Sequence, residues 1–279
     1  MATKKRRKPK AFIKRYGRVL IGGVIIGLIA LAGIFAPLIT SYDPNKVDMS
    51  IAKQKPSYEH PFGTDLYGRD VFSRVIYGTR APFIVGIAVQ AIVICVGTTC
   101  GLICGYFRKA DNIIMRIMEG IHSLPNLLFV LVLTSVLGDG VGNMIIALCI
   151  GGLPGITKNI RGQVLSLKEK EFVECEKAMG SNNFRTLFLH IMPHTTNYLL
   201  IRFSTGISNT ILSLSSLSYL GVGLSPRIPS WGAIISEGQA YILSDPYLVT
   251  YPGLAIAITV FGFCLLGEGL RDILDPRYK

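Results

Sequence analysis

Long apolar runs alternate with polar segments along most of this chain. A run near 20 residues crosses a hydrocarbon core of roughly 30 Å as a helix that rises about 1.5 Å per residue. The pattern predicts an all-α, polytopic membrane protein with six transmembrane helices. The six runs cover residues 19–39, 82–106, 113 to the turn at 138–142, 143 to about 158, 198 to about 223, and 252 to about 267.

The polar segments between these runs give the expected domain organisation. A basic tail (1–18) precedes the first transmembrane helix (19–39), which is longer than the roughly 7–15 residues of a signal-peptide core and is therefore expected to stay uncleaved. An outer loop (40–80) leads to a five-helix core (81–270), and a short C-terminal segment (271–279) closes the chain.

Composition and charge support a membrane protein with a defined orientation. Charged residues make up 16% of the chain, against roughly 25% in soluble domains. The net charge of +12 is concentrated before the first apolar run, which indicates a cytoplasmic anchor flank and not a nucleic-acid-binding arm. With both ends inside, 22 of the 29 Lys and Arg residues fall on the inner side and 7 on the outer side. The positive-inside rule therefore predicts cytoplasmic termini.

The polar segment at residues 168–194, here called loop 168–194, is expected to be helical. Gly180 follows a first helical pattern where a left-handed residue suits a helix end. Asn182 or Asn183 can cap a second helix. The apolar residues of that helix share one face until Pro193, which is expected to stop it, and these residues are Phe184, Leu187, Phe188, Ile191 and Met192.

The spacing within ECEKAMG (174–180), with Pro193 thirteen positions after the glycine, resembles the EAA motif of ATP-binding-cassette (ABC) importer permeases. Cys175 and Glu176 depart from the usual pair of alanines. The resemblance implies a type I ABC importer permease fold in which this loop is cytoplasmic and couples the membrane helices to an ATPase subunit. The docking residues that it implies are Glu171, Glu174, Ala178, Gly180 and Pro193. The alternative is an ordinary amphipathic connection between two transmembrane helices.

Three further segments are similar to the dipeptide and oligopeptide branch of this family: HPFGTDLYGRDVFSRVIYGTR, LGVGLSPRIPSWG and PGLAIAITVFGFCLLGEGLRDILDP. The resemblance implies one permease subunit of a peptide importer in the bacterial cytoplasmic membrane. The implied partners are a second homologous permease, two ABC ATPase subunits, an extracytoplasmic peptide-binding protein and membrane lipids, with no nucleic acid. A nickel or nickel-chelate importer is the alternative within the branch.

Several polar residues within or beside the apolar runs are candidates for the transport pathway or for a subunit interface. Glu119 lies one helical turn from Arg116 near the inner end of the third run, where pairing or snorkelling is also possible. The fifth run is rich in hydroxyl and amide side chains, which bond across helices or line a wet path. Its candidate residues are Ser208, Asn209 and Ser213.

Other features predict local structure. Gly97, Gly101 and Gly105, spaced by four, predict close helix contact. In the outer loops, Asp65, Arg69 and Asp70 can pair locally, and Trp231 is expected to be an interfacial anchor. The six cysteines show no metal-ligand spacing and are expected to be small buried apolar residues.

Known catalytic motifs are absent from the sequence. It contains no GxxxxGK[ST] phosphate loop, no HExxH and no GxSxG, so ATP hydrolysis is assigned to partner subunits and no cofactor or metal is expected. A secondary transporter or channel is the alternative of another class. Such a protein needs charged coupling residues near the middle of the membrane, whereas the clear charges here lie near helix ends.

Overall fold

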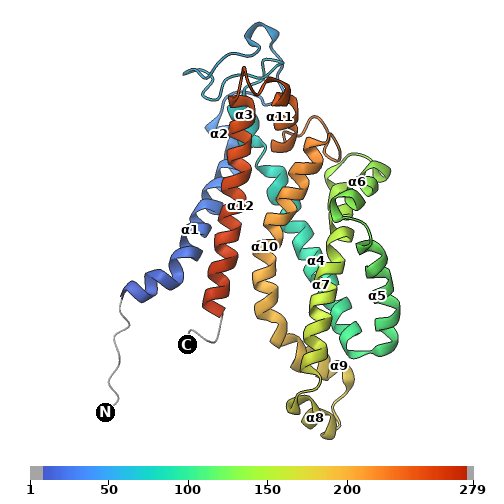
Figure 1. The fold of residues 1–279 in the computed structure, drawn as a ribbon. Helices are drawn as coiled ribbons and strands as arrows, with labels where there is room; N and C mark the ends of the chain where they lie inside the picture. Colours follow the sequence, from blue (N-terminus) through green and yellow to red (C-terminus); the bar gives the residue numbers. More distant parts are fainter. Residues whose placement is uncertain (1–8, 275–279) are drawn as a thin grey trace.

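The computed structural model describes residues 9–274, and all regular structure within them is helical apart from an isolated bridge between Thr64 and Asp70 (Figure 1). The α-helices in chain order are α1 (Pro9–Ile34), α2 (Ala36–Ile39), α3 (Val71–Tyr77), α4 (Arg80–Tyr106), α5 (Arg108–His122), α6 (Asn126–Leu137), α7 (Val141–Leu167), α8 (Glu171–Ala178), α9 (Asn183–Arg185), α10 (Met192–Tyr219), α11 (Trp231–Gly238) and α12 (Tyr247–Leu274). Short helical segments are η1 (Met49–Ile51), the π-helix η2 (Thr186–Ile191) and η3 (Gln239–Tyr241).

The helices agree with the predicted all-α membrane class. By length and composition, four segments can cross a membrane, or five if the bent pair α5 and α6 counts as one. α10 is as long as these helices, but its Ser, Thr and Asn residues make it less apolar. Six transmembrane helices are compatible with this arrangement and remain a prediction.

The first transmembrane helix ends earlier than predicted. α1 stops at Ile34, and residues 36–39 form the separate helix α2. Pro37 explains the break, because it lacks the N–H that would continue the helical hydrogen bond to the Gly33 carbonyl. Arg80 replaces that donor, with its Nε 2.7 Å from the Gly33 oxygen.

The third apolar run is two helices and not the single helix that was predicted. α5 and α6 meet at an angle of 89° across residues 123–125. Pro125 cannot donate a backbone hydrogen bond to the preceding turn, and the Ser123 hydroxyl donates to the Gly120 carbonyl at the end of α5 (2.8 Å). The bend places α5 and α6 side by side with α7 (Figure 1).

The predicted glycine face is confirmed where α4 packs along α7. A Cβ atom on Gly101 would lie 2.7 Å from the Cβ of Ile160 and 2.8 Å from the Thr157 carbonyl oxygen. Gly97 and Gly105 meet the same helix at similar distances. Because real Cβ atoms do not approach so closely, these glycines allow the two backbones their short separation.

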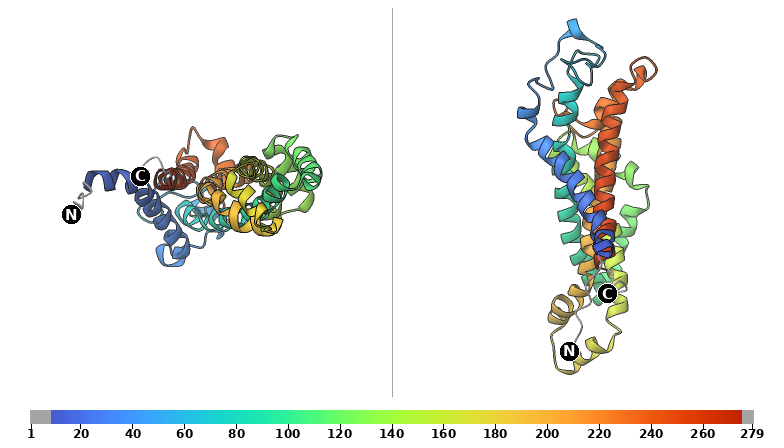
Figure 2. Two further views of the ribbon diagram at one scale, coloured as in Figure 1. Left: turned by 90° about the horizontal axis from the view of Figure 1, so that it is seen from below. Right: turned by 90° about the vertical axis from the view of Figure 1, so that its left-hand side faces the viewer.

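The helices form an elongated array, with α1 and α12 at one edge and α5 and α6 at the other (Figure 2). α1 packs along α12, while α4, α7 and α10 form the middle. The start of α1, the end of α12 and α8 lie at one end of the molecule, and the 40–80 loop and α11 lie at the opposite end (Figure 1). This agrees with a topology in which both termini and loop 168–194 share one side. Residues 1–8 of the tail and 275–279 lie outside the described residues.

The cysteine prediction is correct for only part of the set. All six are free, and Cys104 and Cys149 are buried. Cys95 and Cys175 are exposed, so the expectation of burial is wrong for these two. Cys95 lies on an exposed position of α4, and Cys175 lies on α8, which projects beyond the main array (Figure 1).

Candidate functional site

Loop 168–194 begins with α8, which ends in the glycine turn that the sequence predicts. Gly180 has φ +79°, a left-handed conformation that residues with a Cβ adopt at a cost. The Ser181 N–H donates to the Glu176 carbonyl (3.0 Å), the long-range bond of a Schellman motif. Gly180 therefore both ends α8 and redirects the chain toward α9.

The second half of the loop is continuous with the next long helix. Asn182 caps α9 through its side chain, which accepts a hydrogen bond from the Phe184 N–H, as predicted. The chain then runs through η2 directly into α10, so the prediction that Pro193 stops the helix is wrong. Pro193 lies in the first turn of α10 after a π-helical segment, and the wider π turn accommodates its missing N–H.

Buried apolar residues fasten the loop to the membrane helices. Val173 on α8 and Leu187 and Ile191 on η2 are fully buried in the same core as Val164 of α7. At the start of the loop, the Lys168 ammonium donates to the Gly105 carbonyl at the end of α4 (3.1 Å). The loop is therefore packed against the ends of α4, α7 and α10, and a displacement of the loop would be carried to these helices.

The residues expected to dock an ATPase lie on the exposed side of this loop. Glu171 and Glu174 both occupy the first turn of α8, are exposed and form no ion pair with the side chains that the structure describes. Ala178, Gly180 and Pro193 are also exposed. Large apolar side chains accompany them, with Met179 at 74%, Phe184 at 60% and Leu189 at 62% exposure. The predicted apolar face of the second helix is therefore partly buried and partly exposed. Its exposed residues belong to the same surface as Glu171 and Glu174.

One polar contact in the loop was not predicted. The Glu176 carboxylate lies 3.4 Å from Nε2 of His190, and both side chains are partly buried. This contact joins α8 to η2 across the Gly180 turn. The spacing between the two residues carries no helical or strand periodicity, so only the folded turn reveals the pair.

A polar cavity of about 220 Å³ lies between α4, α7, α10 and the bend that joins α5 to α6. Asn209 and Ser213, two of the pathway candidates, line it together with Gln90 and Arg202. Gln90 Nε2 donates to the Thr210 hydroxyl across the α4–α10 contact (2.9 Å). The cavity thus combines neutral hydrogen-bonding groups, the imidazole of His122 and one guanidinium with apolar side chains.

The other two pathway candidates lie elsewhere. Ser208 is buried on the opposite side of α10, where its hydroxyl donates to the Val260 carbonyl of α12 (3.4 Å). Glu119 is exposed on α5 and forms no ion pair with Arg116 within the described residues. The charged contact that does hold α5 is between Asp111 and Arg161 of α7, with distances of 2.5 and 2.7 Å.

Comparison with known proteins gives the family. Residues 97–279 match the family described as "Binding-protein-dependent transport system inner membrane component". The chain belongs to this family. Residues 15–57 of this permease match "N-terminal TM domain of oligopeptide transport permease C". The two matches cover most of the chain, and the helical structure is that of a type I ABC importer permease.

Relatives of the permease align along nearly its whole length. It is 37% identical to the "Dipeptide transport system permease protein DppC" of Alkalihalophilus pseudofirmus, over 96% of this chain and 88% of that protein. It is 36% identical to the "Glutathione transport system permease protein GsiD" of Pectobacterium atrosepticum, over 97% and 90%. It is 40% identical to the "Probable peptide ABC transporter permease protein y4tQ" of Sinorhizobium fredii, over 95% and 91%.

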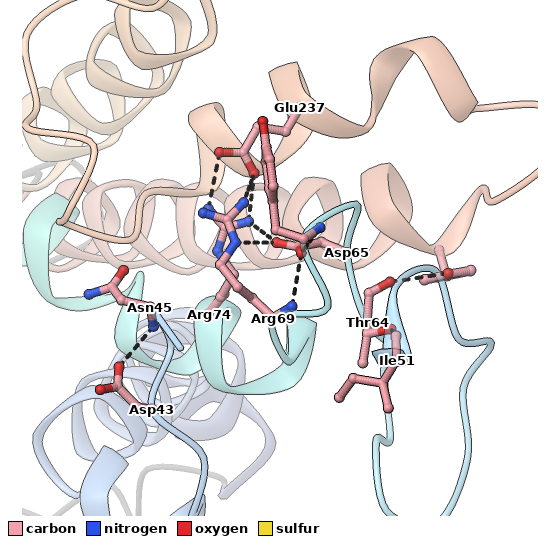
Figure 3. Close-up of polar contacts among 10 residues, drawn as sticks. Asp43, Asn45, Ile51, Thr64, Asp65, Arg69, Arg74 and Glu237 are labelled. Atoms are coloured by element: carbon pink, nitrogen blue, oxygen red, sulfur yellow. Dashed lines mark hydrogen bonds and ion pairs between the residues drawn. The ribbon is translucent and has the colours of Figure 1, made fainter. Parts of the chain in front are cut away.

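At the opposite end of the permease, a charged network joins the 40–80 loop to α11 (Figure 3). Asp65 accepts from Arg69 (2.7 Å), which confirms the predicted local pair, and from Arg74 (2.6 Å). Both arginines also reach Glu237 of α11, each at 2.6 Å. Arg74 is 3% exposed, and its ion pairs with Asp65 and Glu237 offset the free-energy cost of burying its charge. Glu237 was not predicted, because 163 residues separate it from Arg74.

Asp70 and Trp231 complete this outer layer of the permease. Asp70 caps α3 by accepting from the Ser73 N–H (2.7 Å). Trp231 is fully buried, and its Nε1 donates to the Val75 carbonyl (2.9 Å). The prediction that Trp231 is an interfacial anchor is therefore wrong, because the ring packs into the core that holds α3 and α11 together.

Proposed function

We propose that this chain is one permease subunit of an ATP-driven importer that moves short peptides across the bacterial cytoplasmic membrane. The observation that carries the proposal is loop 168–194, which exposes three carboxylates and five large apolar side chains at one end of the molecule. The carboxylates are those of Glu169, Glu171 and Glu174, and the apolar side chains are Met179, Phe184, Phe188, Leu189 and Met192. An exposed apolar surface of this kind is typical of a protein–protein interface. Because the chain belongs to a family of binding-protein-dependent transport permeases, we expect an ABC ATPase subunit to bind this surface.

The mechanism follows from how the loop is fastened. An ATPase subunit that binds α8 and moves on nucleotide binding displaces Val173, Leu187 and Ile191 together, because all three are packed in the core. The displacement reaches α7 and α10, which flank the polar cavity. Nucleotide-driven motion therefore changes the shape of the cavity without ATP contacting this chain.

The proposed assembly contains a second homologous permease, two ABC ATPase subunits and an extracytoplasmic peptide-binding protein. The helix array is elongated (Figure 2), and the helices around the cavity leave large apolar side chains exposed within the described residues, among them Ile87 of α4, Ile146 of α7 and Leu212 of α10. These side chains favour a second permease as a packing partner. Lipids surround the remaining apolar surface. Peptides are the favoured substrate because the relatives named above are dipeptide, glutathione and peptide permeases.

Uptake by the reconstituted complex tests this function. We expect proteoliposomes that contain both permeases, the ATPases and the binding protein to take up labelled tripeptide only when ATP is supplied on the ATPase side. A variant of the ATPase that lacks its phosphate-loop lysine serves as the control. Uptake by this chain alone under an ion gradient would indicate a secondary transporter, and uptake of nickel without peptide would indicate the metal importer.

Labelling of introduced cysteines tests the orientation. We expect Asn182→Cys, in a background without the six native cysteines, to be protected from an impermeant maleimide in sealed cells and labelled after lysis. The reason is that most basic residues flank the helices on the side of loop 168–194. Tyr58→Cys in the 40–80 loop, where Tyr58 is fully exposed, is the matched control and should be labelled in sealed cells. The reverse pattern would refute the topology and the docking surface together.

A further inference from the structure

Arg202 is an arginine on α10 for which the described residues provide no partner. It lies ten residues after the start of α10, about 15 Å along the helix axis. Its Nε is buried and has no hydrogen-bond acceptor, and no carboxylate among residues 16–274 forms an ion pair with it. A guanidinium with a buried and unsatisfied Nε is costly unless it meets an anion or water, so the position favours a bound ligand.

The surroundings of Arg202 favour an anion. It lines the polar cavity, and no Asp or Glu is among the lining residues. His122, at the end of α5, is the other titratable residue there, and the remaining polar groups are hydroxyls and amides. A cation has no carboxylate to bind in this cavity. An anionic group would meet a guanidinium, whose planar fork matches a carboxylate.

Hydrogen bonds hold neutral groups of the same cavity in place. Gly206, one turn after Arg202, leaves the space that the Gln90 amide fills, since a Cβ there would lie 2.1 Å from Gln90 Oε1. The Gln90 amide donates to Thr210, and Thr210 donates to the Gly206 carbonyl (2.9 Å). These bonds fix one wall of the cavity beside α10.

The size of the cavity limits what it holds. At about 220 Å³ it is smaller than the roughly 300–1,000 Å³ of pockets that enclose a whole drug-sized ligand. It can therefore take one end of a peptide, while the rest extends into the space beside the second permease. The end that bears a negative charge is the C-terminus.

We propose that this cavity is a subsite for the C-terminal carboxylate of the transported peptide, with the Arg202 guanidinium as its binding group. The inference rests on the proposed function and adds a site for one end of the substrate. It requires a free carboxylate and places no requirement on the amino end, because the cavity offers no acid to an ammonium group. Gln90, Asn209 and Ser213 supply hydrogen bonds near the same end of the peptide.

Direct binding to the assembled permease complex in nanodiscs, without the binding protein or nucleotide, tests the subsite. The probes are labelled trialanine, its C-terminal amide and its N-acetyl form. We expect trialanine and N-acetyl-trialanine to bind the wild type about tenfold more tightly than the amide, since a hydrogen bond to a charged group is lost. Arg202→Gln should remove this preference, and Arg202→Lys should keep part of it.

The matched control is Arg116→Gln, which removes an arginine that lies outside the cavity and should leave the preference unchanged. Equal binding of the amide and the free acid by the wild type, or no detectable binding of either, would overturn the subsite. A preference that survives in Arg202→Gln would do the same, as expected if Arg202 pairs with the second permease. ATP-driven uptake by the wild-type complex tests the proposed function separately, so the subsite can fail while that function stands.

Discussion

Gly180→Val is expected to abolish most ATP-driven uptake while the subunit still inserts into the membrane. Gly180 has φ +79°, which valine adopts only with strain of about 1–3 kcal/mol. Among the atoms that the structure describes, none outside the neighbouring residues lies within 4 Å of the position a Cβ would take, so the strain arises from the backbone and not from a clash. Relief of that strain rotates α8 away from η2 and displaces the docking surface.

The measurement is peptide uptake and peptide-stimulated ATP hydrolysis by the reconstituted complex. Gly180→Asn is the matched control, because asparagine tolerates the left-handed conformation at lower cost, and it should retain most activity. Equal amounts of both variants in the membrane fraction show that insertion is unaffected. Normal uptake by Gly180→Val would show that the left-handed turn is not required for coupling.

Glu174→Lys is expected to weaken ATPase association or to separate hydrolysis from uptake. Glu174 is exposed in the first turn of α8 and has no ion-pair partner among the side chains that the structure describes, so we expect its carboxylate to meet a basic group on the ATPase. Loss of a partly desolvated charge pair costs about 2–5 kcal/mol, because the partner is left unpaired. A solvated surface charge would contribute only about 0–1 kcal/mol.

Two further charge reversals separate a docking role from a general effect of charge. Glu171→Lys changes the other exposed acid of the same turn and shows which of the two carries the contact. Glu176→Lys breaks the contact with His190 and tests the internal geometry of the loop instead. Copurification of the ATPase subunits and peptide-stimulated hydrolysis are measured for all three, and peptide capture by the binding protein should stay unchanged. Full assembly and stimulation in both Glu171→Lys and Glu174→Lys would remove the acidic docking contact.

Features set by neighbouring residues could be predicted from the sequence. The apolar runs indicated the long helices, and Gly180 and Asn182 indicated the end of α8 and the start of α9. The glycines of α4 indicated close packing because their spacing by four places them on one helix face. The Asp65–Arg69 pair is local for the same reason. The motif in loop 168–194 also indicated the correct family.

Prolines were harder to interpret from the sequence, because their effect depends on what replaces the missing N–H. Pro37 separates α1 from α2, and Arg80 supplies a donor to the freed Gly33 carbonyl. Pro125 lies at a bend of 89°. Pro193 was expected to stop a helix, yet the π turn before it lets the helix continue. A proline therefore indicates an irregularity in a helix, and the surrounding structure decides whether the helix breaks, bends or continues.

The sequence by itself determined the helical class, most of the long helices, the glycine turn of the loop and the family, since each depends on residues within a few turns of one another. The tertiary structure decided which side chains meet. It placed Glu237 with Arg74, buried Trp231 beneath α3, and brought Arg202 to a cavity with Asn209 and Ser213 while turning Ser208 toward α12. These contacts depend on the rotation and packing of helices far apart in the chain, which local periodicity does not specify.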